Sequence, residues 1–278
     1  MDDETYLKIA YRSKLGKKLD LENPVSYNEK LQWLKLYDRR PEYTAMVDKY
    51  EAKKIAAALI GEEYIIPTLG VWDRFEEIDF AQLPDQFVLK CTHDSGGLVI
   101  CKDKNSFDKA AAQQKITRCL SHNFFWGQRE WPYKNIRPRI IAEQYMEDAA
   151  TKDLRDYKFF AFNGDVKALF IATERAAEAE TKFDFFDADF NHLPFTNGHP
   201  NAEVPPSKPE CFEEMKDLAA KLSAGLPQIR IDLYEVNGKV YFGEFTFFHW
   251  SGFQPFVPEK WDYIFGGWID LPQKHTKG

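Results

Sequence analysis

Two carboxylates and an arginine lie on the two arms of a predicted β-hairpin near the end of the chain. Arg230 and Asp232 are on the first arm and Glu244 is on the second, with an Asn-Gly turn at positions 237 and 238 between them. Because side chains alternate along a strand and the hairpin closes at the turn, Asp232 and Glu244 are expected to approach each other. Two close carboxylates repel unless a cation joins them, and hard oxygen ligands suit Mg²⁺. The pattern predicts a magnesium site; the alternative is a solvated sheet face on which Arg230 forms ion pairs.

The second feature whose residues could do chemistry is a lysine beside a glycine-containing turn. Lys90 ends an apolar run and is followed by Ser95, Gly96 and Gly97, which would lie in the turn of another hairpin. Free backbone N–H groups in such a turn, next to an ammonium group, can bind phosphate. The order is not that of a Walker A loop, because the lysine precedes the glycines. The alternative is an ordinary hairpin whose lysine extends toward water.

Two further polar positions follow predicted strands. Glu143, Gln144 and Tyr145 end the apolar run 139–145, where backbone groups could meet the edge of an adenine ring. A charge that faces water is the alternative interpretation of Glu143. Arg175 follows another strand, and its planar guanidinium could bind a substrate carboxylate, but a surface arginine fits the pattern equally well.

The elements that position these residues are an alternation of helices and hairpin-forming strands. Ser26 and Glu29 form a capping box that predicts a helix from Tyr27 to Tyr37. Because helices do not separate nearly every strand, we expect an α+β or α/β protein with mostly antiparallel sheets and not a doubly wound nucleotide-binding fold. The other predicted elements are helices over 42–59, 106–121 and 210–224, strands over 64–67, 86–91, 97–101, 139–145, 156–163, 166–173, 229–236 and 240–247, and a surface loop over 191–209.

Composition limits the classes of partner. The formal net charge is −7, so the chain has no bulk attraction for nucleic acid or acidic lipid. The four cysteines show no C-x-x-C spacing, which argues against a zinc or redox site. No run approaches 18 apolar residues, and the first residues lack the apolar core of a signal peptide. We therefore expect no membrane span and a cytoplasmic location.

The order of the polar motifs resembles that of the ATP-grasp superfamily of carboxylate–amine ligases, which includes D-alanine–D-alanine ligase. Within it, the chain resembles the TupA-like branch of teichuronopeptide and capsular or surface polysaccharide synthesis, whose members are often labelled glycosyltransferases. The similarity is carried by five segments, 26–39, 88–97, 129–145, 156–164 and 230–247. The motifs are, in order, Asp48-Lys49, Lys90 with the glycine turn, Glu143-Gln144-Tyr145, Arg230-x-Asp232 and Glu244-x-Thr246.

This resemblance implies an ATP-grasp fold, in which two α+β subdomains grip ATP, with a short helical N-terminal segment. The implied parts are the helical segment over 1–45, an N-terminal part with the glycine-loop hairpin over 46–142, and a C-terminal subdomain with the metal-binding hairpin over 143–278. The implied cofactors are ATP and Mg²⁺.

The resemblance also implies roles for residues that contact ATP. Lys49 and Lys90 correspond to the two lysines that hold the phosphates. The segment Ser95-Gly96-Gly97 corresponds to the mobile flap over those phosphates. The hinge that meets adenine corresponds to Glu143-Gln144-Tyr145, and Asp156 or Lys158 lies in the region that holds ribose or phosphate.

The metal site is implied in the same way. Asp232 and Glu244 correspond to magnesium ligands, and Arg230 to the residue that stabilises an acyl phosphate. Thr246 stands where relatives usually have Asn, so a second metal is expected to be held differently.

The implied reaction is attack of a carboxylate oxygen on the γ-phosphoryl group of ATP, after which an amine traps the acyl phosphate. Aromatic side chains near cations suit an acidic sugar, so we expect an acidic sugar or polysaccharide precursor and an amino acid or amine as substrates. These side chains are Trp126, Arg129, Trp131, Tyr133, Lys134, Phe248, His249, Trp250 and Trp261.

Two other classes of function remain open. A glycosyltransferase or sugar kinase is one, because Asp187-Ala188-Asp189 matches a D-x-D motif. A non-catalytic carbohydrate-binding protein is the other. It is disfavoured because a pure binding protein needs neither the lysines Lys49 and Lys90 nor the carboxylates.

Overall fold

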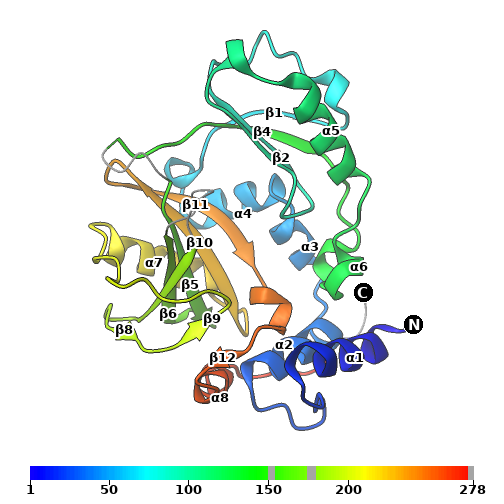
Figure 1. The fold of residues 1–278 in the computed structure, drawn as a ribbon, viewed down its shortest axis with the longest axis vertical. Coiled ribbons are helices and arrows are strands. Elements are labelled where there is room, and N and C mark those ends of the chain that lie inside the picture. Colours follow the sequence, from blue (N-terminus) through cyan, green and yellow to red (C-terminus); the bar gives the residue numbers. More distant parts are fainter. Residues whose placement is uncertain (150–153, 174–179, 275–278) are drawn as a thin grey trace. The chain divides into compact units, whose positions relative to one another are not determined.

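The chain forms two compact units in the computed structural model, which describes residues 1–149, 154–173 and 180–274 (Figure 1). The large unit combines Met1–Arg40 with Asp148–Gly278, and the small unit is the continuous segment Pro41–Glu147. The N-terminal helices thus belong to the large unit, whereas the sequence-based division treats 1–45 as a separate segment. The physical reason is that their buried sides pack on elements from the end of the chain.

A six-stranded antiparallel sheet forms the centre of the large unit, in the order β11-β10-β5-β6-β7-β8. Asn163-Gly164 and Asn237-Gly238 make the turns of two hairpins, and all four residues have positive φ, as two-residue hairpin turns require. Both predicted hairpins are confirmed. The strands are β5 (Asp156–Phe162), β6 (Asp165–Thr173), β7 (Lys182–Asp187), β8 (His192–Leu193), β10 (Ile229–Val236) and β11 (Lys239–Thr246), with β9 (Thr196–Asn197) and β12 (Phe256–Val257) as a separate pair.

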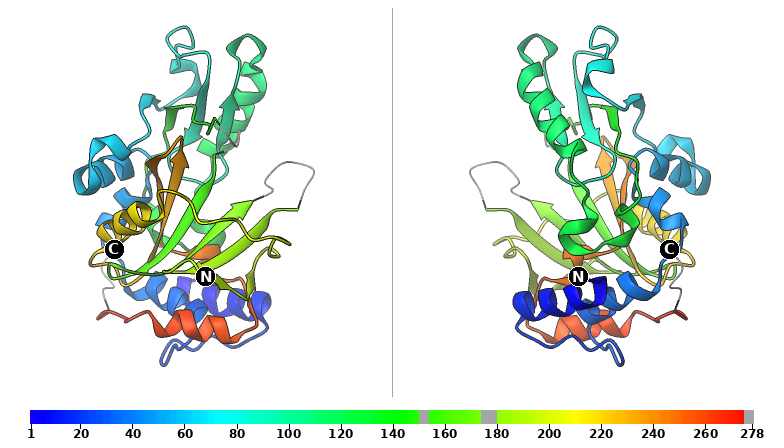
Figure 2. Two further views of the ribbon diagram at one scale, coloured as in Figure 1. Left: turned by 90° about the vertical axis from the view of Figure 1, so that its left-hand side faces the viewer. Right: turned by 90° about the vertical axis from the view of Figure 1, so that its right-hand side faces the viewer.

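Helices cover both faces of this sheet. Phe159 of β5 contacts Phe212 of α7 with 6.1 Å between ring centroids, and the next residue, Phe160, contacts Phe265 of α8 at 5.3 Å. Because successive side chains of a strand point to opposite faces, α7 covers one face and α8 the other. Tyr27 of α2 adds an edge-on contact to Phe265 at 5.7 Å. Figure 2 shows α8 grouped with the N-terminal helices. The helices of this unit are α1 (Asp3–Leu15), α2 (Tyr27–Tyr37), α7 (Phe212–Ser223), α8 (Lys260–Gly267) and the short turn η5 (His249–Gly252).

The small unit has a four-stranded antiparallel sheet in the order β1-β4-β2-β3. One face of the sheet packs on α5, where Phe87, Leu89, Ile116 and Ala142 share one buried cluster. The elements are α3 (Glu42–Val47), α4 (Glu51–Ile60), η1 (Glu62–Tyr64), β1 (Thr68–Trp72), η2 (Phe75–Glu77), β2 (Phe87–Cys91), β3 (Leu98–Cys101), η3 (Lys104–Ser106), α5 (Lys109–Leu120), α6 (Phe125–Gln128), η4 (Trp131–Tyr133) and β4 (Ile140–Gln144). In the described part of either unit, no helix is long and apolar enough to cross a bilayer.

Three local predictions are wrong. The helix expected over 42–59 is two helices, because the Asp48 carboxylate accepts hydrogen bonds from the backbone N–H groups of Tyr50 (2.8 Å) and Glu51 (3.1 Å) and begins α4 there. The strand expected over 64–67 begins later, at Thr68, since Pro67 has no N–H to donate to a ladder. The loop expected over 191–209 contains the short strands β8 and β9.

Candidate functional site

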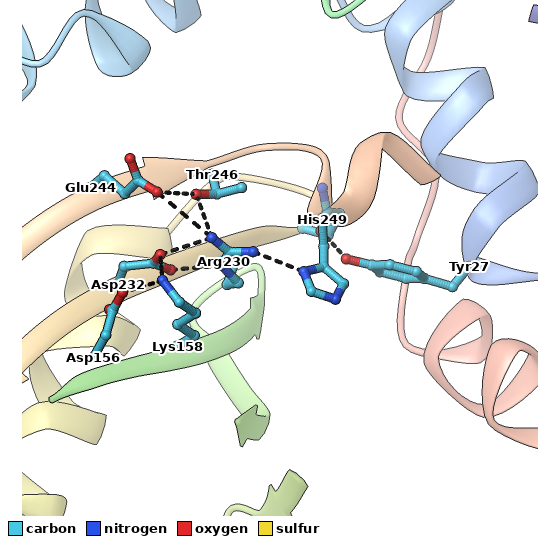
Figure 3. Close-up of polar contacts among 9 residues, drawn as sticks. Tyr27, Asp156, Lys158, Arg230, Asp232, Glu244, Thr246 and His249 are labelled. Atoms are coloured by element: carbon cyan, nitrogen blue, oxygen red, sulfur yellow. Dashed lines mark hydrogen bonds and ion pairs between the residues drawn. The ribbon is translucent and has the colours of Figure 1, made fainter. Parts of the chain in front are cut away.

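The polar residues predicted for the large unit lie on one face of β5, β10 and β11 (Figure 3). Strand pairing places Asp232 opposite both Lys158 and Glu244, and Arg230 opposite Thr246. Directly opposite residues of neighbouring strands point to the same face, so the sheet itself brings these side chains together. We call the set the carboxylate cluster: Asp156, Lys158, Arg230, Asp232, Glu244 and Thr246.

A β-bulge sets the register of Asp232 against Glu244. The pairing of β10 with β11 shifts between Asp232 and Leu233, whose partner is Phe242, so Gly243 is the extra residue. A Cβ atom at Gly243 would lie 2.8 Å from the carbonyl oxygen of Asp232, which explains why glycine occupies this position. Without the bulge, counting back from the turn would place Asp232 opposite position 243.

Lys158 joins two carboxylates of the cluster. Its Nζ lies 2.5 Å from Oδ2 of Asp156 and forms an ion pair with Oδ2 of Asp232. The Asp232 side chain is only 1% exposed. Burial alone would lower the pKa of Lys158, but the two carboxylates outweigh it and the pKa is raised. Lys158 therefore stays charged and neutralises Asp232 on the side of β5.

Arg230 contacts the same carboxylate at two points. Its Nε and Nη2 lie 2.7 Å and 2.8 Å from the two oxygens of Asp232, and Nη2 also donates to the Thr246 hydroxyl at 3.1 Å. Burial alone would raise the pKa of Asp232, but Arg230 and Lys158 outweigh it and hold that pKa well below its usual range. The cluster thus keeps an ionised carboxylate and a fixed guanidinium side by side.

The cluster presents the oxygens of Asp232 and Glu244 to a cation such as Mg²⁺, although both oxygens of Asp232 already contact Arg230 and Lys158. Asp232 and Glu244 are directly opposite residues on the neighbouring strands β10 and β11. The Glu244 side chain is 39% exposed, so it can reach an incoming ion. The Thr246 hydroxyl donates to Glu244 Oε1 at 3.3 Å and accepts from Arg230, so it is already engaged within the cluster. Among the described residues no group of three or more His, Cys, Asp or Glu side chains could hold a metal alone. Water and phosphate oxygens would have to supply the remaining ligands of Mg²⁺.

In the small unit, two lysines hold the carboxylate of Glu143. Lys90 Nζ and Lys53 Nζ each lie 2.5 Å from a different oxygen, and Lys53 also donates to the backbone oxygen of Ile66 at 2.7 Å. Burial alone would raise the pKa of Glu143, but Lys90 and Lys53 outweigh it and lower the pKa to about 2. The Glu143 side chain is 5% exposed, so the interpretation of a charge facing water is wrong.

Lys53 is the residue of this group that sequence reasoning missed. It lies on α4, four positions after Lys49, which precedes that helix, and burial lowers its pKa even though Glu143 is adjacent. The available signal was the spacing of Lys49 and Lys53 after Asp48, where a helix begins. Nothing in that spacing indicates the distant Glu143.

Lys49 contacts the glycine loop, defined as residues 92–97. Its backbone N–H donates to the carbonyl oxygen of Thr92 at 3.0 Å, and its Nζ donates to the carbonyl oxygen of Asp94 at 2.7 Å. The structure therefore brings Lys49 together with the loop, while Lys90 points to Glu143.

The two glycines of the loop have different surroundings. Gly97 is buried, and a Cβ atom there would lie 2.6 Å from Cys91 Sγ. Ser95 and Gly96 are exposed, and the nearest atom to a Cβ at Gly96 is 4.0 Å away, on Asp94. Asp94 Oδ1 accepts the N–H of Gly97 at 3.0 Å and so shapes the turn. The exposed side of the loop is the part available to a ligand.

The remaining predicted site residues have other surroundings. Gln144 is exposed at the end of β4. Tyr145 donates to Glu147 Oε2 at 2.6 Å, and Lys102 Nζ lies 5.5 Å from its ring centre. Arg175 lies outside the described residues.

The aromatic residues considered for sugar binding divide by exposure. Trp131, Phe248 and His249 are buried, and they act as packing residues at least in part. Trp126 and Trp250 are exposed. These two indoles are the large exposed rings among the side chains named above.

The D-x-D motif forms a turn after β7. Asp187 accepts hydrogen bonds from the backbone N–H groups of Asp189 (2.9 Å) and Asn191 (2.8 Å). Such a carboxylate shapes its own loop, which is an ordinary structural role for Asp.

Comparison with protein families places this chain among the ATP-grasp proteins. The matching family model is described as TupA-like ATPgrasp and covers residues 29–270, which is most of the chain. The chain belongs to the TupA-like ATP-grasp family, as the resemblance of its motifs implied.

Solved structures of two ligases and a synthetase are also similar. D-alanine–D-alanine ligase from Bacillus anthracis, complexed with ATP, is 16% identical with a TM-score of 0.43, over 73% of this chain and 55% of that one. The corresponding ligase from Helicobacter pylori is 13% identical with a TM-score of 0.49, over 90% and 68%. D-cycloserine synthetase DcsG is 15% identical with a TM-score of 0.43, over 74% and 64%. The chain thus spans little more than half the length of the first of these ligases. No curated protein sequence matches it significantly.

Proposed function

We propose that this chain is an ATP-dependent carboxylate–amine ligase that works through an acyl phosphate. The observation that carries the proposal is the juxtaposition of Arg230, Asp232 and Glu244 on one strand face of an ATP-grasp protein. Two oxygen ligands beside a fixed cation suit a reaction in which negative charge develops on phosphoryl oxygens.

In the large unit, Asp232 and Glu244 would hold Mg²⁺, with Thr246 beside them. Bound Mg²⁺ supplies a positive charge that offsets the charge of the phosphoryl oxygens. Arg230 would bind the acyl phosphate, and its contacts with Asp232 hold the guanidinium ready for this role. Lys158 keeps Asp232 ionised before the ion binds.

In the small unit, Lys49 and Lys90 would bind the phosphates of ATP. One carboxylate oxygen of Glu143 orients Lys90. Lys53 forms an ion pair with the other oxygen and so holds the Glu143 side chain in place. The exposed part of the glycine loop would cover the phosphates and exclude water from the acyl phosphate. Backbone groups of the segment 143–145 would meet the adenine.

The second substrates in this proposal are an acidic sugar, free or in a polysaccharide precursor, and an amino acid or another amine. The role in polysaccharide biosynthesis is the one implied by the resemblance to the TupA-like branch. The exposed rings of Trp126 and Trp250 support a sugar substrate, because aromatic faces stack on sugar rings. Arg175 remains a candidate for binding the substrate carboxylate.

Hydroxylamine trapping tests this function. The protein is incubated with Mg-ATP, D-glucuronate and hydroxylamine, and the products are hydroxamate, ADP and phosphate. We expect hydroxamate only when ATP and the uronate are both present, with loss of product in Glu244→Gln. ADP together with a stable sugar phosphate would identify a kinase. Release of UDP from a nucleotide-sugar without ATP consumption would identify a glycosyltransferase.

A further inference from the structure

His249 completes the contacts around the guanidinium of Arg230. Nη1 of Arg230 lies 2.8 Å from Nδ1 of His249, while Nε and Nη2 bind Asp232. Figure 3 shows the imidazole on the opposite side of the guanidinium from Asp232 and Lys158. His249 is buried, and the reaction proposed above gives it no role.

The hydrogen bonds determine which nitrogen of His249 carries the proton. A guanidinium only donates, so Nδ1 must accept. Nε2 lies 2.9 Å from Oδ1 of Asn197 and therefore carries the hydrogen. The amide NH₂ of Asn197 donates to the carbonyl oxygens of Gln254 (3.2 Å) and Pro255 (3.1 Å), which leaves Oδ1 facing the imidazole. Arg230 thus donates to His249, His249 donates to Asn197, and Asn197 donates to the backbone. The imidazole is therefore the neutral Nε2–H tautomer.

The surroundings of His249 keep it neutral. Burial, followed by the charges of Arg230 and Lys158, lowers its pKa well below the ordinary value, and Asp232 opposes this without reversing it. Its ring stands edge-on to Phe160, with 5.0 Å between ring centroids. Nδ1 therefore remains an acceptor at physiological pH.

The loop that carries His249 is held in an unusual backbone conformation. Trp250, Ser251 and Gly252 have φ of 49°, 54° and 64° in succession. Non-glycine residues in this region persist only where the surrounding structure enforces them, which is common at functional sites. Gln32 Nε2 donates to the carbonyl oxygens of Ser251 (3.0 Å) and Gly252 (2.8 Å), and Lys35 Nζ donates to that of Ser251 at 2.7 Å. Helix α2 thus fixes the backbone on which the imidazole is placed.

We propose that His249 is a positioning residue that, as a neutral acceptor, fixes the guanidinium of Arg230, and that Asn197 fixes the tautomer. Asp232 and Thr246 hold the Nε and Nη2 side of the guanidinium, and the contact with His249 holds the remaining nitrogen, Nη1. The contact with His249 thereby fixes the direction in which Nη1 presents its second N–H. The proposal rests on the proposed function only in giving Arg230 a part in the reaction.

A pair of substitutions separates positioning from packing. His249→Asn keeps an acceptor close to the place of Nδ1, whereas His249→Phe keeps a ring and removes the acceptor. In the hydroxamate assay with D-glucuronate we expect kcat of the Asn variant within about 5-fold of wild type and a loss of about 100-fold in the Phe variant, the size of one charge-assisted hydrogen bond. KM for ATP should stay unchanged. Wild-type kcat in the Phe variant, or equal losses in both, would overturn the proposal.

A second experiment does not depend on the reaction. Selective ¹⁵N labelling of histidine and arginine should show His249 as the Nε2–H tautomer without titration from pH 5 to 8, and slow rotation of the Arg230 guanidinium. Asn197→Asp places a carboxylate at Nε2 and should introduce a titration that wild type lacks. A wild-type imidazole that titrates in this range, or an Nδ1–H tautomer, would refute the positioning role. Should the wild type yield neither hydroxamate nor ADP, the ligase proposal fails, and these spectra alone decide the role of His249.

Discussion

Arg230 and Asp232, two positions apart on β10, meet in a two-point contact with N···O distances of 2.7 Å and 2.8 Å. Side chains two positions apart on a strand point to the same face, so the strand itself brings these two together. The contact is therefore local in sequence, and it is also buried. A buried pair of this kind stabilises the fold only while both members are present, because the loss of one leaves an uncompensated charge.

Arg230→Met should therefore destabilise the protein strongly. We expect a loss of about 3–5 kcal/mol in the free energy of unfolding, measured in urea, because Asp232 would keep only Lys158 as a neutralising partner. Arg74→Met is the matched control, since Arg74 pairs with Glu77 at the surface and its side chain is 75% exposed. Its loss should leave the free energy of unfolding nearly unchanged, because water already screens an exposed ion pair. Equal costs for the two variants would contradict the assigned burial of Asp232.

The two candidate metal ligands should respond differently to loss of charge. Glu244→Gln should keep the stability of the fold, because the side chain is partly exposed, and should weaken the Mg²⁺ dependence of ATP binding. Asp232→Asn should lower the stability of the fold and also weaken the Mg²⁺ dependence of ATP binding, because Arg230 and Lys158 would face a neutral amide. Titration of Mg²⁺ at fixed ATP, followed calorimetrically, measures the first effect and urea unfolding the second. Unchanged Mg²⁺ dependence in Glu244→Gln would argue against the metal assignment.

Glu143 should make the small unit sensitive to acid. Its pKa is about 2 against an ordinary value of 4.5, so its ion pairs stabilise the fold fully above pH 4.5. This stabilisation falls progressively as the pH drops from 4.5 to 2, and it amounts to about 3 kcal/mol at roughly 1.4 kcal/mol per pH unit. Glu143→Gln should remove this component from the acid unfolding curve, at a cost in stability near neutral pH.

Glu213→Gln is the control for that measurement. Glu213 also pairs with two lysines, Lys208 and Lys216, but its side chain is 63% exposed. Its removal should leave the acid unfolding profile essentially unchanged, because water screens exposed ion pairs. An identical acid profile in wild type and Glu143→Gln would show that the lysine contacts do not hold the Glu143 carboxyl ionised.

The glycine loop offers a matched pair of alanine substitutions. Gly97→Ala would place a Cβ atom 2.6 Å from Cys91 Sγ, so we expect a loss of about 1–3 kcal/mol from overpacking. Gly96→Ala meets nothing closer than 4.0 Å and should be nearly neutral for stability. Thermal unfolding of both variants checks the contrast. A Gly96→Ala variant that is less stable than Gly97→Ala would contradict the described loop.

Local signals carried most of the correct predictions about the fold. The Ser26–Glu29 capping box is present in the structure, with Ser26 accepting the N–H of Glu29 at 3.2 Å. The Asn-Gly turns likewise act through the conformations of only two residues. The polar face of β10 and β11 could be predicted because a single hairpin contains it.

Long-range relationships could not be predicted from such signals. The contact of Lys53 with Glu143 joins residues 90 positions apart, and no local pattern encodes it. The bulge at Gly243 was missed because a glycine within a strand has several possible meanings. The individual roles assigned to Lys49, Lys90, Asp232 and the other site residues remain predictions for the experiments above.

The division of the chain also has a consequence for the order in which the protein is made. Residues 41–147 form a continuous unit that can fold as soon as they leave the ribosome. The first 40 residues must wait, because Asn28 of α2 gives its backbone N–H to Asp262 and the Tyr27 ring packs on Phe265, more than 230 positions later. Until residues 262 and 265 have been synthesised, the apolar sides of these helices lack the cover that they have in the folded unit.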